Sequence, residues 1–297
     1  MLAHLSDPHL APLMRPRLRE LAGKRVIGVA NWRWRRRLEH QMHVLDALLE
    51  DLAAQHPDHT AVTGDLVNVA AAGEFGPARS FLTRIGSPEA VTFVPGNHDA
   101  YVRATVPYAA RHWGEFMTGD PPAGTAPHFP FLRRRGPVAL IGLSTGVPTG
   151  PFMAWGRLGA EQIARLDTLL ENLAGEQVFR VVLLHHPPIG HAGDRFKRLV
   201  DRGAFAEVLR RRGADLVLHG HDHSRSLGFL DGPSGRIPVA GVPSASALGR
   251  QHDPAGYSLF RIEKVGDGWR CEMVARGLAS PGATALTEQE RRWLTPA

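Results

Sequence analysis

The feature that most restricts how this chain can fold is a recurring pattern, in which a short apolar run stops at a group of polar side chains. The clearest example is the run 90–94, which a Pro-Gly turn ends and which Asn97, His98 and Asp99 follow. Such runs are typical of buried strands in a parallel sheet. Similar runs cover residues 2–5, 60–62, 179–184 and 215–218. Because ligands bind beyond the carboxyl ends of such strands, the polar groups are expected to meet.

Segments with helical character lie between the apolar runs. They cover residues 38–54, 75–85, 158–173 and 195–212, whereas 12–29 is expected to be a loop. Alternating strands and helices predict an α/β fold with a mainly parallel sheet. A β-rich part is expected from about residue 224, and a short terminal helix from Thr287 that contains Trp293. Since no repeat or linker divides the sequence, residues 1–297 are expected to form one domain.

The composition limits the chemistry and the partners of this protein. A single cysteine, Cys271, excludes an intramolecular disulfide and a cysteine-based metal cage. The formal net charge of +6 favours anionic partners such as phosphates, although a basic surface without a specific partner is the alternative. We find no secretory signal and no uninterrupted apolar stretch that could span a membrane, so a cytoplasmic location is expected.

A basic segment at 12–37 separates the first two polar groups. From Arg15 to Arg37 it carries nine lysine or arginine residues against one acid, Glu20, and it includes Trp32 and Trp34. It could contact an anionic membrane surface, which would make the protein peripheral to the membrane. Nucleic-acid binding by charge and stacking is favoured less. The third alternative is a solvated basic surface whose tryptophans pack on the core.

The polar residues at the strand ends have the chemistry of metal ligands. Carboxylate, amide oxygen and imidazole suit divalent ions such as zinc, manganese or iron. They are too many for one tetrahedral site, and they suffice for two ions that share a bridging carboxylate. The set comprises Asp7, His9, Asp65, Asn97, His98, His185, His221 and His223.

In order along the chain, these residues form five blocks: Asp7-x-His9, Gly64-Asp65, Gly96-Asn97-His98-Asp99, His185-His186-Pro187-Pro188 and Gly220-His221-x-His223. This ordered set resembles the signature of the calcineurin-like metallophosphoesterases. Each block is common by itself, whereas five in order are specific. The resemblance implies a four-layer αββα sandwich of two mixed β-sheets flanked by helices.

The resemblance also implies a role for each residue. Asp7, His9 and His223 would hold the first metal ion, Asn97, His185 and His221 the second, and Asp65 would bridge the two. His98, together with Asn97, would contact the substrate phosphate. His98 would then either stabilise its charge or protonate the leaving oxygen, and Asp99 would orient the His98 ring. His186 would either contact the metal ligands without binding an ion itself or form part of the turn that follows the strand.

The reaction implied is hydrolysis of a phosphoester by in-line attack of a metal-bridging hydroxide. A phosphodiester substrate is expected, because the blocks around Asn97 and His185 look like those of the cyclic-nucleotide phosphodiesterase branch. The alternatives on the same site are a lipid or nucleotide pyrophosphatase and a phosphomonoesterase, with a nuclease favoured less. A non-catalytic scaffold that kept the fold is the alternative from another class, and it would be expected to have lost ligands. The sequence does not predict the oligomeric state.

Overall fold

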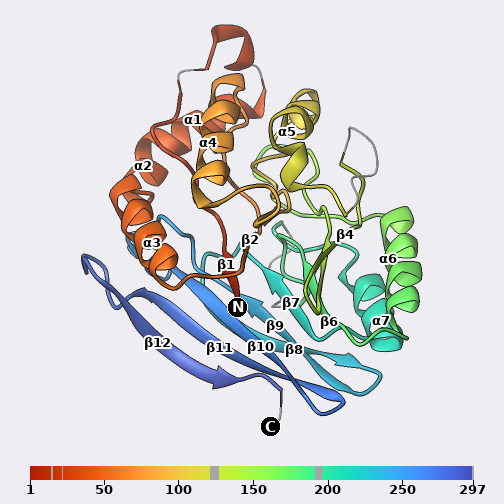
Figure 1. Ribbon diagram of the computed structural model, residues 1–297. Helices are drawn as coiled ribbons and strands as arrows, with labels where there is room; N and C mark the ends of the chain where they lie inside the picture. Colours follow the sequence, from red (N-terminus) through yellow and green to blue (C-terminus); the bar gives the residue numbers. More distant parts are fainter. Residues whose placement is uncertain (15, 22, 121–126, 191–195, 296–297) are drawn as a thin grey trace.

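Two six-stranded sheets form the centre of the molecule (Figure 1). The structure is a computed structural model and describes the chain except residues 15, 22, 121–126, 191–195 and 296–297. No helix in the described ranges is long and apolar enough to cross a membrane.

The first sheet has the strand order β12-β11-β10-β1-β2-β3. Three short parallel strands form one half of it, and three antiparallel strands from the end of the chain extend it. The strands are β1 (Leu2–Leu5), β2 (His59–Val62), β3 (Val91–Phe93), β10 (Gly256–Val265), β11 (Gly268–Leu278) and β12 (Leu286–Trp293). β10 pairs antiparallel with β1, so the two ends of the chain share one sheet.

The second sheet has the order β4-β5-β6-β7-β9-β8. Its four central strands are parallel, and antiparallel strands close both edges. The strands are β4 (Phe131–Arg135), β5 (Val138–Gly142), β6 (Phe179–Leu183), β7 (Leu216–His219), β8 (Ser226–Gly232) and β9 (Gly235–Gly241). The predicted fold class, two mixed sheets flanked by helices, is therefore confirmed.

Helices cover the outer faces of the two sheets (Figure 1). The α-helices are α1 (Lys24–Asn31), α2 (Arg37–Glu39), α3 (Met42–Ala54), α4 (Phe75–Ile85), α5 (Val106–Trp113), α6 (Ala160–Leu173) and α7 (Arg202–Arg212). Short turns of other helix types are η1 (Leu18–Leu21), η2 (Trp32–Arg36), η3 (Ala72–Glu74), η4 (Arg103–Thr105) and η5 (Gly114–Phe116). Of these, η2 is a π-helix that joins α1 to α2.

The alternation of side chains along β6 shows how the layers are held together. Val181 and Leu183 belong to a core shared with the first sheet, α3 and α4. Val182 and Leu184 belong to a second core, which α6 and α7 complete. Because neighbouring residues of a strand point to opposite faces, a fully apolar strand such as β6 must be covered on both sides.

The predictions of a terminal helix and of a loop at 12–29 are wrong. The residues expected to start a terminal helix at Thr287 form β12, because pairing with β11 satisfies their backbone groups and outweighs local helix propensity. The expected loop 12–29 contains the start of α1. Contacts with another part of the chain stabilise that helix, since the buried Arg25 side chain donates hydrogen bonds to the carbonyl oxygens of Val69 and Ala70.

Candidate metal centre

The candidate ligands follow strands of both sheets. Asp7 and His9 come after β1, Asp65 after β2 and Asn97 after β3 in the first sheet. The histidines come from the second sheet, His185 after β6 and both His221 and His223 after β7. The carboxyl ends of these parallel strands meet at one place, so the expected convergence of the strand ends is what the fold produces.

The backbone at these positions adopts an uncommon conformation. Asp7, His9, Asp65, His221 and His223 all have φ between 40° and 72°, in the left-handed region that non-glycine residues rarely enter. Hydrogen bonds between loops support it: Asp7 N–H donates to the carbonyl oxygen of Gly64, and His9 N–H donates to that of Asp65, at 3.0 and 3.1 Å. Such local strain is retained at functional sites, where it aims side chains.

At two positions only glycine fits, because neighbouring loops approach the backbone closely there. A Cβ atom at Gly96 would overlap the Asp65 carboxylate, and one at Gly220 would overlap the Ser6 side chain and approach Asp7. The glycines that precede Asn97 and His221 in the sequence blocks therefore let neighbouring loops pack together around the carboxylates.

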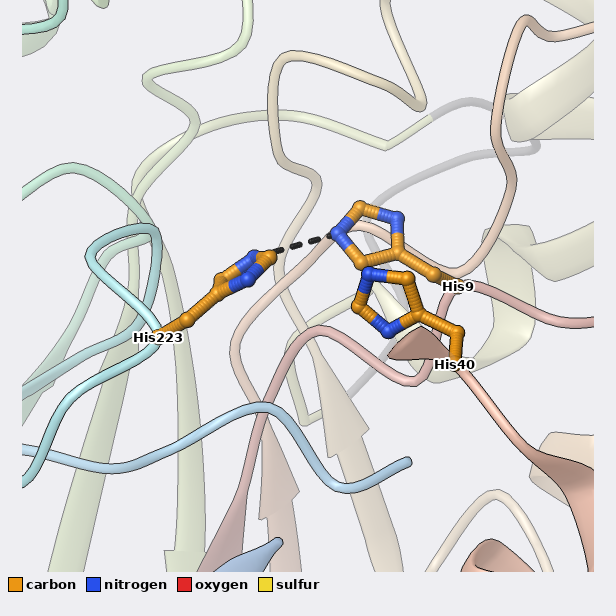
Figure 2. Close-up of side chains that lie close together, drawn as sticks. All are labelled: His9, His40 and His223. Atoms are coloured by element: carbon orange, nitrogen blue, oxygen red, sulfur yellow. Dashed lines mark hydrogen bonds between the residues drawn. The ribbon is translucent and has the colours of Figure 1, made fainter. Parts of the chain in front are cut away.

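The first cluster is built around His9, His40 and His223 (Figure 2). The Nε2 atoms of His9 and His223 face each other at 3.1 Å, and Asp7 Oδ1 lies 3.1 Å from His223 Nε2. The ring of His40 packs beside that of His9, with 4.6 Å between the ring centroids. Sequence reasoning missed His40, because this histidine has no motif context.

The placement of His40 comes from a break between helices. α2 ends at Glu39 and α3 begins at Met42, so the predicted helix 38–54 is interrupted at His40, which has extended backbone and pairs with Ala247. Its Nδ1 lies 2.9 Å from Ser246 Oγ, which fixes the ring orientation. No local signal in the sequence could have identified this residue.

The second cluster is centred on His185. Its Nε2 lies 3.2 Å from both Asn97 Oδ1 and His221 Nδ1. Its Nδ1 donates a hydrogen bond to the carbonyl oxygen of Thr63 at 2.6 Å, so Nε2 is the ring atom turned toward the other candidate ligands. His221 Nε2 is buried without a hydrogen-bond partner.

Asp65 lies between the two clusters. Its Oδ2 is 3.4 Å from His185 Nε2 and 3.9 Å from His9 Nε2. Its Oδ1 accepts a hydrogen bond from the backbone N–H of His98 at 2.8 Å. One carboxylate therefore adjoins both groups of imidazoles.

These donor atoms fit divalent metal ions. Nitrogen and oxygen ligands lie about 2.1 Å from a zinc ion, so two ligands at near-right angles are about 3 Å apart, close to the spacing found here. The two carboxylates favour positive charge at His185. Burial alone would lower the pKa of this imidazole, but the charges of Asp65 and Asp7 raise it to about 10.

His98 points to a different neighbour from the one expected. Its Nδ1 donates a hydrogen bond to the carbonyl oxygen of Asn68 at 2.5 Å, and its Nε2 accepts one from Arg36 Nη2 at 2.8 Å. Burial first, and then the charge of Arg36, lower the pKa of His98 to about 3, so the ring is neutral. Arg36 was singled out in the sequence only as part of a basic segment, because 62 residues separate it from His98.

The prediction that Asp99 orients the His98 ring is wrong. The Asp99 carboxylate accepts hydrogen bonds from the backbone N–H groups of Asp65, Leu66 and Gly96 at 2.7, 3.0 and 2.8 Å. Buried N–H groups need acceptors, and the tight turns after β2 and β3 offer none from secondary structure. Asp99 therefore clamps the loops that present Asp65 and Asn97, and the Asn68 carbonyl holds the His98 ring.

His186 is held by bonds at both ring nitrogens. Nδ1 lies 2.8 Å from Thr145 Oγ1, and Nε2 donates to the carbonyl oxygen of Ala154 at 3.0 Å. Its ring packs against that of His221, with centroids 4.4 Å apart. The geometry suits a residue that positions His221 more than one that binds an ion itself.

Comparison with protein families identifies the class of this chain. Residues 1–225 match the model of the calcineurin-like phosphoesterase family. The chain belongs to that family and is a hydrolase that acts on phosphoester bonds. Comparison with curated protein sequences finds no match.

Solved structures share the fold at low identity. A dimetal phosphatase from Danio rerio superposes with a TM-score of 0.57 at 14% identity, covering 99% of this chain and 98% of that one. The purple acid phosphatase PPD1 from yellow lupin gives a TM-score of 0.57 at 12% identity, covering 97% of this chain and 53% of that one. At such identities the similarity establishes the fold alone.

Proposed function

We propose that this protein is a phosphodiesterase that uses two divalent metal ions, from among manganese, iron and zinc. One observation carries the proposal: seven nitrogen and oxygen donors from both sheets converge in two adjoining clusters that share Asp65. When bound, two such ions act as Lewis acids on the phosphoryl oxygens and lower the pKa of a bound water.

The ligand assignment follows the two clusters. Asp7, His9 and His223 would hold one ion, Asn97, His185 and His221 would hold the other, and Asp65 would contact both. His40 is a further candidate ligand beside the first cluster, since its ring lies against His9.

Arg36 would bind the substrate phosphate, held in place by His98. The neutral His98 ring has its proton on Nδ1, which donates to Asn68, so Nε2 has none to give to a leaving group or to a phosphate oxygen. Nε2 instead accepts a hydrogen bond from Arg36, which brings a guanidinium to this place. This arrangement supports charge stabilisation by Arg36, which His98 positions, rather than proton donation by His98.

The preference for a diester rests on the sequence blocks around Asn97 and His185, which look like those of the cyclic-nucleotide phosphodiesterase branch. Among the described residues, Arg36 is the lysine or arginine whose side chain contacts the imidazoles of the site. Beside the ions, its guanidinium would be available to one phosphate oxygen.

The test is a comparison of two soluble aryl substrates. The purified protein is assayed on bis-p-nitrophenyl phosphate and on p-nitrophenyl phosphate, after its manganese, iron and zinc content is measured by mass spectrometry. We expect about two metal ions per chain and a kcat/KM at least tenfold higher for the diester. A higher value for the monoester would overturn the diester preference, and metal-loaded protein without turnover of either would favour the scaffold alternative.

The same preparation can identify the natural substrate class. Cyclic nucleotides, nucleotides and nucleotide-lipid pyrophosphates form the second panel. Preferred hydrolysis of a pyrophosphate bond would replace the phosphodiesterase proposal with the pyrophosphatase alternative.

A further inference from the structure

The outer side of the segment from α1 to α2 presents an unusual combination of side chains. Its exposed residues are Val26, Ile27, Asn31, Arg33, Trp34, Arg35, Arg37 and Leu38, and we call them the 26–38 surface. Trp34 is 76% exposed, although a tryptophan side chain is among the largest apolar groups a protein can bury.

The polarity of this segment departs in part from that of an ordinary surface helix. A helix on a globular domain turns its apolar side inward and its charges to solvent. Here Val26, Ile27 and Leu38 face solvent. The charged side chains of Arg25 and Arg36 point inward instead, Arg25 to the carbonyl oxygens after β2 and Arg36 to His98. Exposed apolar groups gathered in this way mark an interaction surface.

The arginines of the 26–38 surface are available for a partner. Within the described part of the chain, Arg33, Arg35 and Arg37 form no ion pair with a carboxylate. Some arginines elsewhere do form such pairs, namely Arg165 with Glu161, Arg210 with Glu207 and Arg291 with Glu288, whereas other exposed arginines of the described ranges, such as Arg103, Arg111 and Arg198, do not. Three unpaired positive charges among apolar side chains favour an anionic partner.

A second exposed apolar group lies beside the same segment. Lys24 Nζ donates a hydrogen bond to Thr149 Oγ1 at 3.2 Å, which places the loop around 149–153 against the start of α1. This loop exposes Phe152, which is 84% accessible, and Met153. Exposed apolar side chains from a distant part of the sequence therefore lie on a loop that contacts the start of α1.

We propose that the 26–38 surface binds the anionic face of a lipid bilayer. Tryptophan and aliphatic side chains partition into the interfacial region of a membrane, while arginines attract anionic headgroups. A second copy of this chain fits less well. A two-fold contact would bring the same arginines of both copies together, and residues 21–38 contain no aspartate or glutamate to compensate.

Nucleic acid also fits less well than lipid. Single strands bind by stacking bases on aromatic side chains. On the 26–38 surface the exposed aromatic side chain is Trp34, and the other apolar groups are aliphatic. Aliphatic groups gain from burial in lipid and offer no platform for a base.

The position of this surface relates it to the metal centre. Arg36 belongs to the same segment and contacts both His98 and His9. If the proposed function holds, a phosphoester at the membrane surface would have a short path to the site. The membrane binding itself does not depend on that function.

The proposal is tested by co-sedimentation of the full chain with vesicles. Vesicles of equal parts phosphatidylglycerol and phosphatidylcholine are compared with pure phosphatidylcholine at low and high salt. We expect at least tenfold tighter binding to the anionic vesicles, weakened at high salt. Trp34→Ala should weaken binding severalfold, and the triple variant Arg33→Gln, Arg35→Gln, Arg37→Gln at least tenfold.

Matched variants test whether the loss of positive charge elsewhere, or of any exposed tryptophan, also weakens vesicle binding. The triple variant Arg165→Gln, Arg210→Gln, Arg291→Gln removes the same charge from other faces, and Trp293→Ala removes an exposed tryptophan from β12. Both should bind as the unaltered protein does. Circular dichroism verifies that every variant is folded, independently of vesicle binding and of the proposed function.

Four results would overturn the proposal. The first is no preference for anionic vesicles. The second is equal loss of binding in the control triple variant, which would show a general charge effect. The third is that Trp34→Ala dissociates a dimer in light scattering, which would assign the surface to a second copy. The fourth is that the surface binds a single-stranded oligonucleotide that anionic vesicles do not displace, which would assign it to nucleic acid.

Discussion

Arg36 carries a positive charge into a site otherwise made of imidazoles, carboxylates and the Asn97 amide. Its guanidinium lies 2.8 Å from His98 Nε2 and 3.4 Å from His9 Nδ1. The neighbouring Arg33 and Arg35, on the same π-helical turn, point to solvent. Of these three arginines, Arg36 therefore lies in the site and the other two lie in solvent. The path of the backbone is what distinguishes their environments.

Replacing Arg36 should impair turnover. A hydrogen bond from a charged donor is worth about 1.5–3 kcal/mol, so Arg36→Ala should lower kcat/KM for an aryl phosphodiester by roughly 10- to 100-fold. Arg36→Lys keeps the charge and should recover part of the loss. Arg35→Ala is the matched control and should leave kcat/KM for this soluble substrate unchanged. A fully active Arg36→Ala variant would remove Arg36 from the site.

Asp65 is the carboxylate whose loss should be most damaging. Asp65→Asn keeps the shape and the acceptor oxygen for His98 N–H, but it removes the negative charge between the two clusters. We expect fewer than two metal ions per chain by mass spectrometry and turnover below a thousandth of that of the unaltered protein. Circular dichroism should be unchanged. Full activity with two bound ions would contradict a bridging role for this residue.

At the scale of elements, a partly buried ion pair joins α3 to the first sheet. Asp51 accepts hydrogen bonds from Arg276 Nε at 2.8 Å, Arg276 Nη2 at 2.7 Å and the Tyr257 hydroxyl at 2.5 Å. Burial alone would raise the pKa of Asp51, but the hydrogen bonds from Arg276 and Tyr257 lower it. The contact joins a helix to β10 and β11 from the far end of the sequence.

Asp51→Asn should destabilise the protein in a pH-dependent way. We expect a loss of about 1–2 kcal/mol in the free energy of unfolding at pH 7, followed by thermal or urea unfolding. Because the folded-state pKa of Asp51 is lowered, its contribution is complete above the unfolded-state value of about 4 and is lost as the pH falls through the folded-state value. The difference between variant and unaltered protein should therefore shrink in acid.

A matched control for Asp51 lies on the same helix. Asp46 pairs with Arg84, but both side chains are about half exposed, so Asp46→Asn should cost less than about 0.5 kcal/mol. An equal loss for both variants, or a difference for Asp51→Asn that persists at pH 2, would show that the ion pair is not the cause.

Elements were predictable where the local pattern and the tertiary surroundings agree. The continuous apolar residues of β6 predict a buried strand, and the helical spacing of apolar residues predicts α6. Both elements are buried in the way that these patterns require. β12 was missed because Thr287–Trp293 is polar and helix-compatible, and only the open edge of β11 makes it a strand. α1 was missed because its support comes from contacts of Arg25 with a distant loop.

For the molecule as a whole, the candidate metal centre joins the two sheets. Asp7, Asp65 and Asn97 follow strands of the first sheet, whereas His185 and His223 follow strands of the second. Ions held by ligands from both would cross-link the halves of the molecule. Binding to the folded state alone stabilises it by about 3–4 kcal/mol when the ion is present at 100 to 1,000 times its dissociation constant.

Removing the metal should therefore affect both stability and activity. Dialysis against a chelator is expected to lower Tm by several degrees and to abolish diester turnover, and adding back manganese or zinc should restore both. The Asp65→Asn variant should show a much smaller change in Tm on chelation. An unchanged Tm after proven metal loss would mean that the two sheets associate without help from the ions.

The sequence alone determined the family, the two-sheet fold class and the candidate ligands, because a strand followed by a polar turn is a local pattern and the order of the five blocks is specific. Only the tertiary structure placed Arg36, His40 and Asp99. Arg36 and His40 come from a segment without a site motif, and Asp99 turned from His98 toward unsatisfied backbone N–H groups. The physical reason is that these contacts join residues far apart in the chain and depend on how loops with unusual backbone angles pack, which no local pattern records.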